Sequence, residues 1–198
     1  MSLVHASITM SLDGFITEPD DGPGCGLGLG GEPLHYWVFG GPWSYDSPGR
    51  GEPVGEDKAW LEETMAANGA VVAGRGTYEA AGHWGDENPW GIPTFVVTHR
   101  PEEQPTGDDF VFVGGLAEAI ERAKDAAGDK QVSVMGGAQI IGETLDAGLA
   151  DRLTLIIAPL ILGAGKRLFE NLHRPLEFEH VGVRQSQFAT FVEYRVKR

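Results

Sequence analysis

Residues 131–158, QVSVMGGAQIIGETLDAGLADRLTLIIA, decide the fold. The two ends of this stretch, residues 131–135 and 151–158, have the apolar character of buried strands. Between them, large aliphatic side chains recur at every fourth position, which is the spacing of one helix face: Ile141, Leu145 and Leu149. A strand, a helix and a second strand in this order predict a crossover unit whose two strands lie parallel in one sheet.

The rest of the chain continues this alternation of strands and helices. Further strands are expected at residues 3–10, 70–73, 93–98 and 110–113, and further helices at residues 57–67, 78–81 and 116–127. The chain ends in an expected antiparallel hairpin, residues 176–183 and 188–196. We therefore expect a single α/β domain over residues 1–198, with a central, mostly parallel mixed sheet flanked by helices and a C-terminal antiparallel hairpin.

An irregular insertion interrupts this pattern at about residues 19–55. It is dominated by Gly, Pro and Asp, and long loops of this kind are either functional or disordered. Its glycines at 26, 28 and 31 match G-x-G-x-x-G, but no strand precedes them, so we interpret the motif as a loop. Its aromatic residues form a lid or a substrate wall, or else they pack on the body or on a partner subunit: His35, Tyr36, Trp37 and Trp43.

Composition and charge exclude several classes of protein. Lys and Arg number 15 against 29 Asp and Glu, which gives a net charge of −14 that repels nucleic acids and anionic membranes. The single Cys25 has no partner for an internal disulfide, and the six histidines lack metal-ligand spacing, so no metal site is expected. The sequence shows neither a signal peptide nor a long apolar run, which predicts a cytoplasmic protein.

Groups suited to binding phosphate follow three of the predicted strands. Residues 136–137 are two glycines between an expected strand and an expected helix. The first backbone amides of a helix have no partner within it and point toward one place, which suits a phosphate. A tight turn between strand and helix explains the two glycines equally well. Residues 74–77 add a guanidinium and a candidate helix cap, Thr77. Residues 98–100 end a third strand. Each arginine alone fits a surface charge, but ligands of parallel sheets bind beyond the carboxyl ends of the strands, which favours one shared anion site.

At this point the chain resembles a known family. It is similar to the dihydrofolate reductase superfamily, in the branch that contains the reductase domain of bacterial riboflavin biosynthesis and its stand-alone relatives. The similarity rests on an ordered set of segments that spans nearly the whole chain: ITMSLDGFIT at 8–17, VVAGRGTYEAAG at 71–82, PTFVVTHRP at 93–101, VSVMGGAQIIGETLDAGLADRLTLIIAPLILGAGKRLF at 132–169, and the terminal hairpin.

The resemblance implies an activity. The expected protein is an NADPH-dependent reductase that transfers a hydride to a small heterocyclic or carbonyl/imine substrate, such as a ribosylaminopyrimidine of riboflavin biosynthesis. A homodimer is also implied. The deaminase that often accompanies this reductase is not expected here, because its H-x-E and P-C-x-x-C zinc signatures do not occur. The alternative is a non-catalytic module that senses NADPH or another nucleotide, and a flavin-binding protein is a third candidate.

The resemblance also assigns roles to residues. The cofactor's phosphates are implied to contact Gly74, Arg75, Gly76 and Thr77, its adenosine 2′-phosphate Thr98, His99 and Arg100, and its pyrophosphate Gly136, Gly137, Ala138 and Gln139. The resemblance also implies which residues border the nicotinamide and the substrate. Ala6 is expected to contact the cofactor, and the others are expected on the substrate side: Ser7, Asp13, Gly14, Lys166 and Arg167. For the lysine–arginine pair, a solvated surface site is the other interpretation.

Reduction also requires a proton, and two aspartates are candidates for its delivery. Asp57 falls close to the place where dihydrofolate reductases carry a helix carboxylate, although its spacing to Gly74 differs slightly; a helix cap would explain it as well. Asp13 either orients substrate or water, or closes the turn with Gly14.

Overall fold

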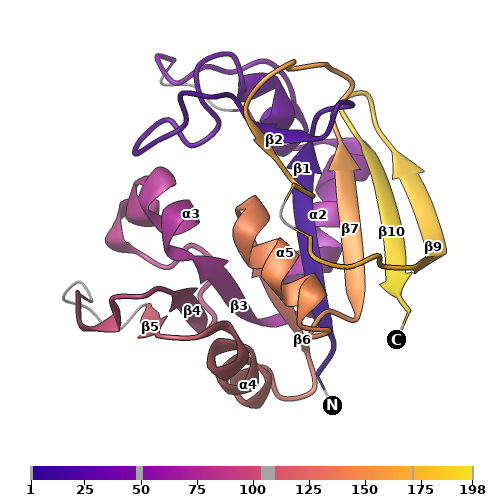
Figure 1. The fold of residues 1–198 in the computed structure, drawn as a ribbon. Coiled ribbons are helices and arrows are strands. Elements are labelled where there is room, and N and C mark those ends of the chain that lie inside the picture. Colours follow the sequence, from indigo (N-terminus) through magenta and orange to yellow (C-terminus); the bar gives the residue numbers. More distant parts are fainter. Residues whose placement is uncertain (1, 48–50, 104–109, 171, 198) are drawn as a thin grey trace.

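An eight-stranded sheet forms the centre of the molecule in the computed structural model, which describes residues 2–47, 51–103, 110–170 and 172–197 (Figure 1). Its strand order is β5-β4-β3-β6-β1-β7-β10-β9. The strands are β1 (Val4–Met10), β3 (Asn68–Gly74), β4 (Thr94–Val97), β5 (Val111–Val113), β6 (Gln131–Met135), β7 (Arg152–Ile157), β9 (Phe178–Gln185) and β10 (Thr190–Val196).

The pairing of these strands confirms the expected mixed sheet. All neighbours from β5 to β7 are parallel, whereas β10 is antiparallel to both β7 and β9. A parallel pair needs a crossover, and helices between the strands supply it. The sequence analysis missed a short second ribbon, in which β2 (Phe15–Thr17) pairs with β8 (Lys166–Arg167). Strands of two or three residues are too short for alternation to reveal.

Helices cover both faces of the sheet. In Figure 1, α4 (Leu116–Ala127) and α5 (Ala138–Asp146) lie in front of it, and α2 (Gly55–Ala67) lies behind. The main core lies between the sheet and the front helices, and β1 contributes Val4 and Ala6 to it. In the described ranges, none of the helices is both long enough and apolar enough to cross a bilayer.

The face of the sheet toward α2 is more polar than the front face. Because side chains alternate along a strand, His5, Ser7 and Thr9 of β1 lie on the side opposite Val4 and Ala6. Strands of a parallel sheet covered on both faces are normally apolar on both. The polar side chains of β1 therefore make the rear face the one on which hydrogen bonds to side chains can form.

The insertion packs on this rear face. It contains two short helices, η1 (Glu32–His35) and α1 (Tyr36–Phe39). The ring of Trp37 meets Trp60 of α2 edge-on at 5.5 Å and Phe191 of β10 at 5.4 Å, and its Nε1 donates to Thr9 Oγ1 at 3.0 Å. The sequence left open whether the aromatic residues of the insertion form a lid or substrate wall or pack on the body of the domain, and Trp37 packs on the body.

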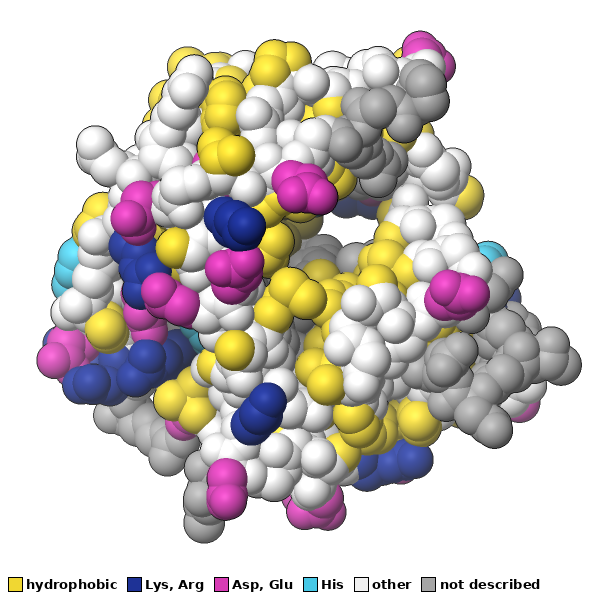
Figure 2. Space-filling view, turned by 180° about the vertical axis from the view of Figure 1, so that it is seen from behind, with side chains coloured by type: hydrophobic (Ala, Val, Ile, Leu, Met, Phe, Trp, Pro, Cys, Tyr) yellow, Lys and Arg dark blue, Asp and Glu magenta, His cyan; other side chains and the backbone are white. Residues whose placement is uncertain are grey.

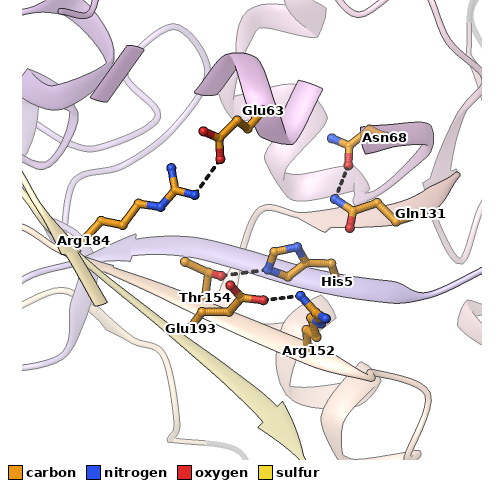
Figure 3. Close-up of polar contacts among 8 residues, drawn as sticks. All are labelled: His5, Glu63, Asn68, Gln131, Arg152, Thr154, Arg184 and Glu193. Carbon is orange, nitrogen blue, oxygen red and sulfur yellow. Dashed lines mark hydrogen bonds and ion pairs between the residues drawn. The ribbon is translucent and has the colours of Figure 1, made fainter. Parts of the chain in front are cut away.

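His5 anchors a polar cluster lower on the same face (Figure 3). Its Nε2 lies 2.7 Å from Thr154 Oγ1, and an ion pair between Arg152 and Glu193 lies beside it. Burial lowers the pKa of His5 below 6.5, and the charge of Arg152 acts in the same direction, while Glu193 opposes them. The folded protein therefore favours a neutral imidazole.

We expect this histidine to make stability depend on pH. The unfolded chain takes up the proton near pH 6.5, and the folded chain takes it up only at lower pH. The contribution of His5 is thus fully present above pH 6.5 and is lost as the pH falls through the folded-state pKa. Urea unfolding on both sides of this window should show a larger loss on acidification for the wild type than for His5→Gln. Equal losses in the two proteins would contradict the prediction.

Candidate active site

The carboxyl ends of β1, β3 and β6 point into one gap between α3 (Arg75–Ala80) and the loops that follow β1 (Figure 1). The space-filling view from behind shows the surface hollowed at this place, with hydrophobic side chains on the walls (Figure 2). Ligands of parallel α/β sheets bind beyond the carboxyl ends of the strands. This hollow is therefore the candidate active site.

Two glycine-containing turns meet at the floor of the site. The Oγ1 of Thr77 in α3 accepts the N–H of Gly137, the residue before α5, at 2.8 Å. Gly136 has φ +103°, and a Cβ built there would lie 2.3 Å from the same Oγ1. Only glycine fits between the two turns. Thr77 is not the helix cap suggested by the sequence: α3 starts at Arg75, its cap residue is Gly74, and the threonine side chain serves the neighbouring turn instead.

Arg75 connects the end of β3 to the end of β4. Its Nε donates to Glu79 Oε1 at 2.8 Å, and its Nη1 donates to Thr98 Oγ1 and to the carbonyl oxygen of Arg100, both at 3.4 Å. Thr98 Oγ1 also accepts the N–H of Arg100 at 3.1 Å. The three strand ends singled out in the sequence are thus joined by direct contacts.

This junction brings two arginines together in an acidic protein, one of them paired with Glu79. Arg75 is partly buried, whereas His99 and Arg100 are exposed beside it. The amino terminus of α5 starts at the same junction with Ala138 and Gln139, and the first amides of a helix have no partner within the helix. The arrangement suits an anion with several negative charges, such as a dinucleotide phosphate.

Asp57 occupies the first turn of α2, the helix behind the sheet. The cap residue of this helix is Val54, so capping does not account for Asp57. The residue is 1% exposed, and its Oδ1 has no hydrogen-bond partner among the described residues. Burial raises the pKa of Asp57, and neighbouring Glu56 adds to this, while a hydrogen bond with Ser186 opposes it. A carboxyl in this setting keeps its proton to higher pH than an exposed aspartate.

Asp13 has a different environment. Its carboxylate accepts the hydroxyl of Ser11 at 2.6 Å and the N–H groups of Leu162 and Gly163 at 3.1 and 2.8 Å. The Ser11 bond is the main reason that the pKa of Asp13 is lowered, and the bond from Gly163 contributes as well. Asp13 therefore stays ionised and ties the loop after β1, including Gly14 at φ +85°, to the loop after β7.

Lys166 and Arg167 of β8 contact the segment that runs from the loop after β1 into the insertion. Lys166 Nζ pairs with Asp21 Oδ2 at 2.5 Å. Arg167 donates to the carbonyl oxygen of Asp13 at 3.1 Å, and its guanidinium lies 4.3 Å from the centre of the Phe15 ring. Both side chains are exposed, and each also has a partner within the protein.

The remaining sequence-selected residues lie at varied depth. Ala6 is fully buried in the front core, with Val134 and Leu153 opposite it in the neighbouring strands, so its side chain does not line the hollow. Ser7 is half-buried on the rear face. Gly76 is exposed, and Gln139 is exposed with its amide donating to Glu143 at 2.8 Å.

A family model for the RibD C-terminal domain matches residues 2–190. The chain belongs to the RibD C-terminal domain family. No curated protein sequence matches it closely enough to supply a relative. Among solved structures, a protein from Shewanella sp. PV-4 assigned to riboflavin biosynthesis is 23% identical, with a TM-score of 0.73 and 99% of each chain covered.

Two further solved structures show the dihydrofolate reductase-like fold. Dihydrofolate reductase from Enterococcus faecalis, complexed with NADP(H), is 16% identical with a TM-score of 0.64, over 99% of this chain and 97% of that one. A deaminase/5-amino-6-(5-phosphoribosylamino)uracil reductase from Thermotoga maritima is 19% identical with a TM-score of 0.62. This chain is covered to 99% and spans 57% of the Thermotoga chain. The expected fold and family are confirmed.

Sequence reasoning missed one contact of this RibD C-terminal domain. Trp37 of the insertion donates to Thr9 of β1, and no periodicity in the insertion indicates that partner. The contact joins residues far apart in the chain and carries no motif.

Proposed function

We propose that this chain is an NADPH-dependent reductase that transfers a hydride to the carbonyl or imine carbon of a small heterocyclic compound. The observation that carries the proposal is the convergence of Arg75, Thr77 and the amino terminus of α5 at the carboxyl edge of the sheet. Two structural neighbours support it, because one holds NADP(H) and the other is named as a reductase.

The residues at this edge fit the phosphates of the dinucleotide. Position 136 has no room for a side chain because Thr77 fills that space, so the turn before α5 lies directly against α3. The N–H of Gly137 is bonded to Thr77, so we assign the pyrophosphate to the next amides, those of Ala138 and Gln139, and the 2′-phosphate to Arg75 with His99 and Arg100 as neighbouring donors. NADPH would supply the hydride when bound there.

Asp57 is the proposed source of the proton. Its burial keeps the carboxyl protonated to higher pH than usual, and its Oδ1 is not committed to any described residue. A buried polar atom without a partner calls for an explanation, and proton donation to a substrate is one that fits the first turn of α2. General acid catalysis of this kind contributes about 10²–10⁴-fold to a rate.

The proposed substrate class is a ribosylaminopyrimidine of riboflavin biosynthesis. This assignment is supported by the family and by the reaction named for the Thermotoga neighbour. Ser7, half-buried on the rear face of β1, is the side chain of that strand that we expect to meet the substrate.

Two measurements test this proposal. Calorimetry should detect NADPH binding by the folded protein, and NADPH absorbance should fall when 5-amino-6-(5-phosphoribosylamino)uracil or its dephosphorylated form, the source of the imine or carbonyl, is added. Binding without oxidation across a panel of such compounds would indicate the nucleotide sensor instead. A coloured protein with a flavin spectrum would indicate the third candidate.

Arginine substitutions at the cationic junction should separate NADPH from NADH. Arg75→Ala and Arg100→Ala are each expected to weaken NADPH about 10–100-fold, because they remove charged hydrogen bonds to the 2′-phosphate. NADH lacks that phosphate and should be affected much less. Arg195→Ala is the matched control, since it removes the same charge at a surface ion pair with Glu179 on the far hairpin. Equal weakening of both dinucleotides would reject the assignment.

A further inference from the structure

The helix α2 has little of the apolar surface that normally fixes a helix to a sheet. Of its residues, all of which the structure describes, Asp57 alone is buried. Trp60 and Leu61 are half-buried, and they pack against a cluster of buried side chains from the insertion and the sheet: Trp37, Ile156, Ala189 and Phe191. A surface helix is usually held by a continuous apolar stripe, so the position of α2 depends on this cluster.

Trp37 joins three elements in the cluster. Its ring meets Trp60 of α2 and Phe191 of β10 edge-on, with ring centres 5.5 and 5.4 Å away, and those two rings stack on each other at 5.1 Å. Its Nε1 donates to the Oγ1 of Thr9 in β1 at 3.0 Å. The indole therefore contacts the helix that carries Asp57 and the strand that leads into the hollow.

The hydrogen bond to Thr9 fixes the orientation of the indole. Trp37 is 5% exposed and Thr9 is 7% exposed, so neither group can exchange this bond for one to water without leaving its place. Thr9 is the last residue but one of β1, at the carboxyl end that opens into the candidate site. A ring held by apolar contacts alone could shift, whereas this one is attached to a defined point of the strand.

The short helix α1 is also packed against the chain that enters α2. It ends at Gly40, which has φ +68° and donates its N–H to the carbonyl oxygen of Tyr36. A Cβ at position 40 would collide with the carbonyl oxygen of Glu52, and one at Gly51 would collide with that of Phe39. The backbone after Trp37 thus lies directly against the residues that precede α2, and the two segments form one packed unit.

We propose that Trp37 is a positioning residue for the reduction: by joining α2 to the end of β1, it fixes where the Asp57 carboxyl lies relative to a substrate in the hollow. Asp57 and Trp60 are three residues apart and share a face of α2, so a shift of one carries the other with it. This inference rests on the proposed reductase function, in which Asp57 delivers the proton. The insertion then contributes to the rate without touching the reacting atoms.

Single-turnover kinetics test the hydrogen bond from both of its ends. Trp37→Phe keeps an aromatic ring but removes the donor, and Thr9→Val keeps the shape but removes the acceptor. Each should slow NADPH oxidation about tenfold, because proton transfer is sensitive to small displacements, while NADPH affinity stays at the wild-type value. The double variant should be no slower than either single one, because both changes remove the same bond. Thr9→Ser should restore the rate.

The titration of Asp57 tests the same inference without a substrate. Carboxyl signals of ¹³C-labelled aspartate are followed against pH, and the signal lost in Asp57→Asn identifies the residue. Burial raises the pKa of Asp57, so the pKa should fall toward 3.8 when Trp37→Leu lets α2 move and water reach the carboxyl. Trp37→Phe and Thr9→Val should lower it less. The charge of Glu56, which also raises this pKa, is the same in every variant.

Trp90→Phe is the matched control for both measurements. Trp90 meets Trp84 edge-on at 4.8 Å and belongs to a different cluster, around Tyr78, so the rate and the Asp57 titration should stay at their wild-type values. The two conservative variants keep the test available if Trp37→Leu does not fold.

An Asp57 titration that is unchanged in every folded Trp37 and Thr9 variant overturns the proposal, whatever the turnover rates. The same conclusion follows if Thr9→Ser behaves like Thr9→Val, or if NADPH affinity falls as much as the rate. A lowered Asp57 pKa in proteins that oxidise no NADPH, the wild type included, would support the link between Trp37 and Asp57 and reject the reductase.

Discussion

Replacing Asp57 with asparagine is expected to slow NADPH-dependent turnover by about 10²–10⁴-fold. Asparagine has nearly the same shape, so it fills the buried position in α2, but its amide cannot release a proton at the pH of the reaction. NADPH affinity should stay close to the wild-type value, because the phosphate-binding junction lies on other elements, α3 and α5. Stopped-flow measurement of NADPH oxidation under single-turnover conditions gives the rate of the chemical step directly.

Asp125→Asn provides the matched control for this substitution. Asp125 lies exposed on α4, on the opposite side of the sheet from α2, so the same aspartate-to-asparagine change is made without touching the site. If Asp57→Asn turned over at the wild-type rate, the proton would come from elsewhere and Asp57 would lose its proposed role. If it abolished cofactor binding as well, the residue would be structural rather than a proton donor.

The substitution Gly136→Ala should damage both stability and cofactor binding. The new Cβ would lie 2.3 Å from Thr77 Oγ1 and 2.6 Å from Thr77 Cγ2, and φ +103° is strained for any side chain. Strain and overpacking each cost about 1–3 kcal/mol, so the free energy of unfolding should fall by roughly 2–6 kcal/mol. The displaced threonine would also lose its bond to the Gly137 N–H, which opens the turn that we assign to the pyrophosphate.

Gly142→Ala separates this specific effect from a general intolerance of α5 to alanine. Gly142 lies inside the helix, and nothing lies within 4 Å of a Cβ built there. Alanine favours helix over glycine by about 1 kcal/mol, so the control should be neutral or stabilising. Chemical unfolding and NADPH calorimetry on both variants decide the matter. A stable Gly136→Ala protein that binds NADPH normally would contradict the close approach of the two turns.

The periodic part of the fold was accessible from the sequence, and the site only in part. Residues 131–158 predicted two parallel strands around a helix, because burial on one face leaves a regular spacing of apolar side chains. The meeting of the β3, β4 and β6 ends followed from the geometry of parallel sheets. The role of Thr77 could not be predicted from the sequence, because a threonine after a strand is also typical of a helix cap. The structure shows that its hydroxyl accepts the N–H of Gly137 in the neighbouring turn instead.

The contacts of the two aspartates could not be predicted for a related reason. Asp13 binds the N–H groups of Leu162 and Gly163, and backbone donors leave no signature in sequence. The burial of Asp57 in α2, which leaves it 1% exposed, depends on packing that the local sequence does not show. Local pattern reveals which face of an element is buried, but it does not reveal which loop will arrive opposite a polar side chain.

The position of β1 affects how the chain can fold. This first strand lies at the middle of the sheet, between β6 and β7, and the side chains of His5 and Thr154, which bond each other, are 149 residues apart in sequence. The sheet therefore cannot close around its centre until most of the polypeptide has been synthesised. Topologies with such distant pairings fold slowly, and their early strands remain exposed to wrong partners meanwhile.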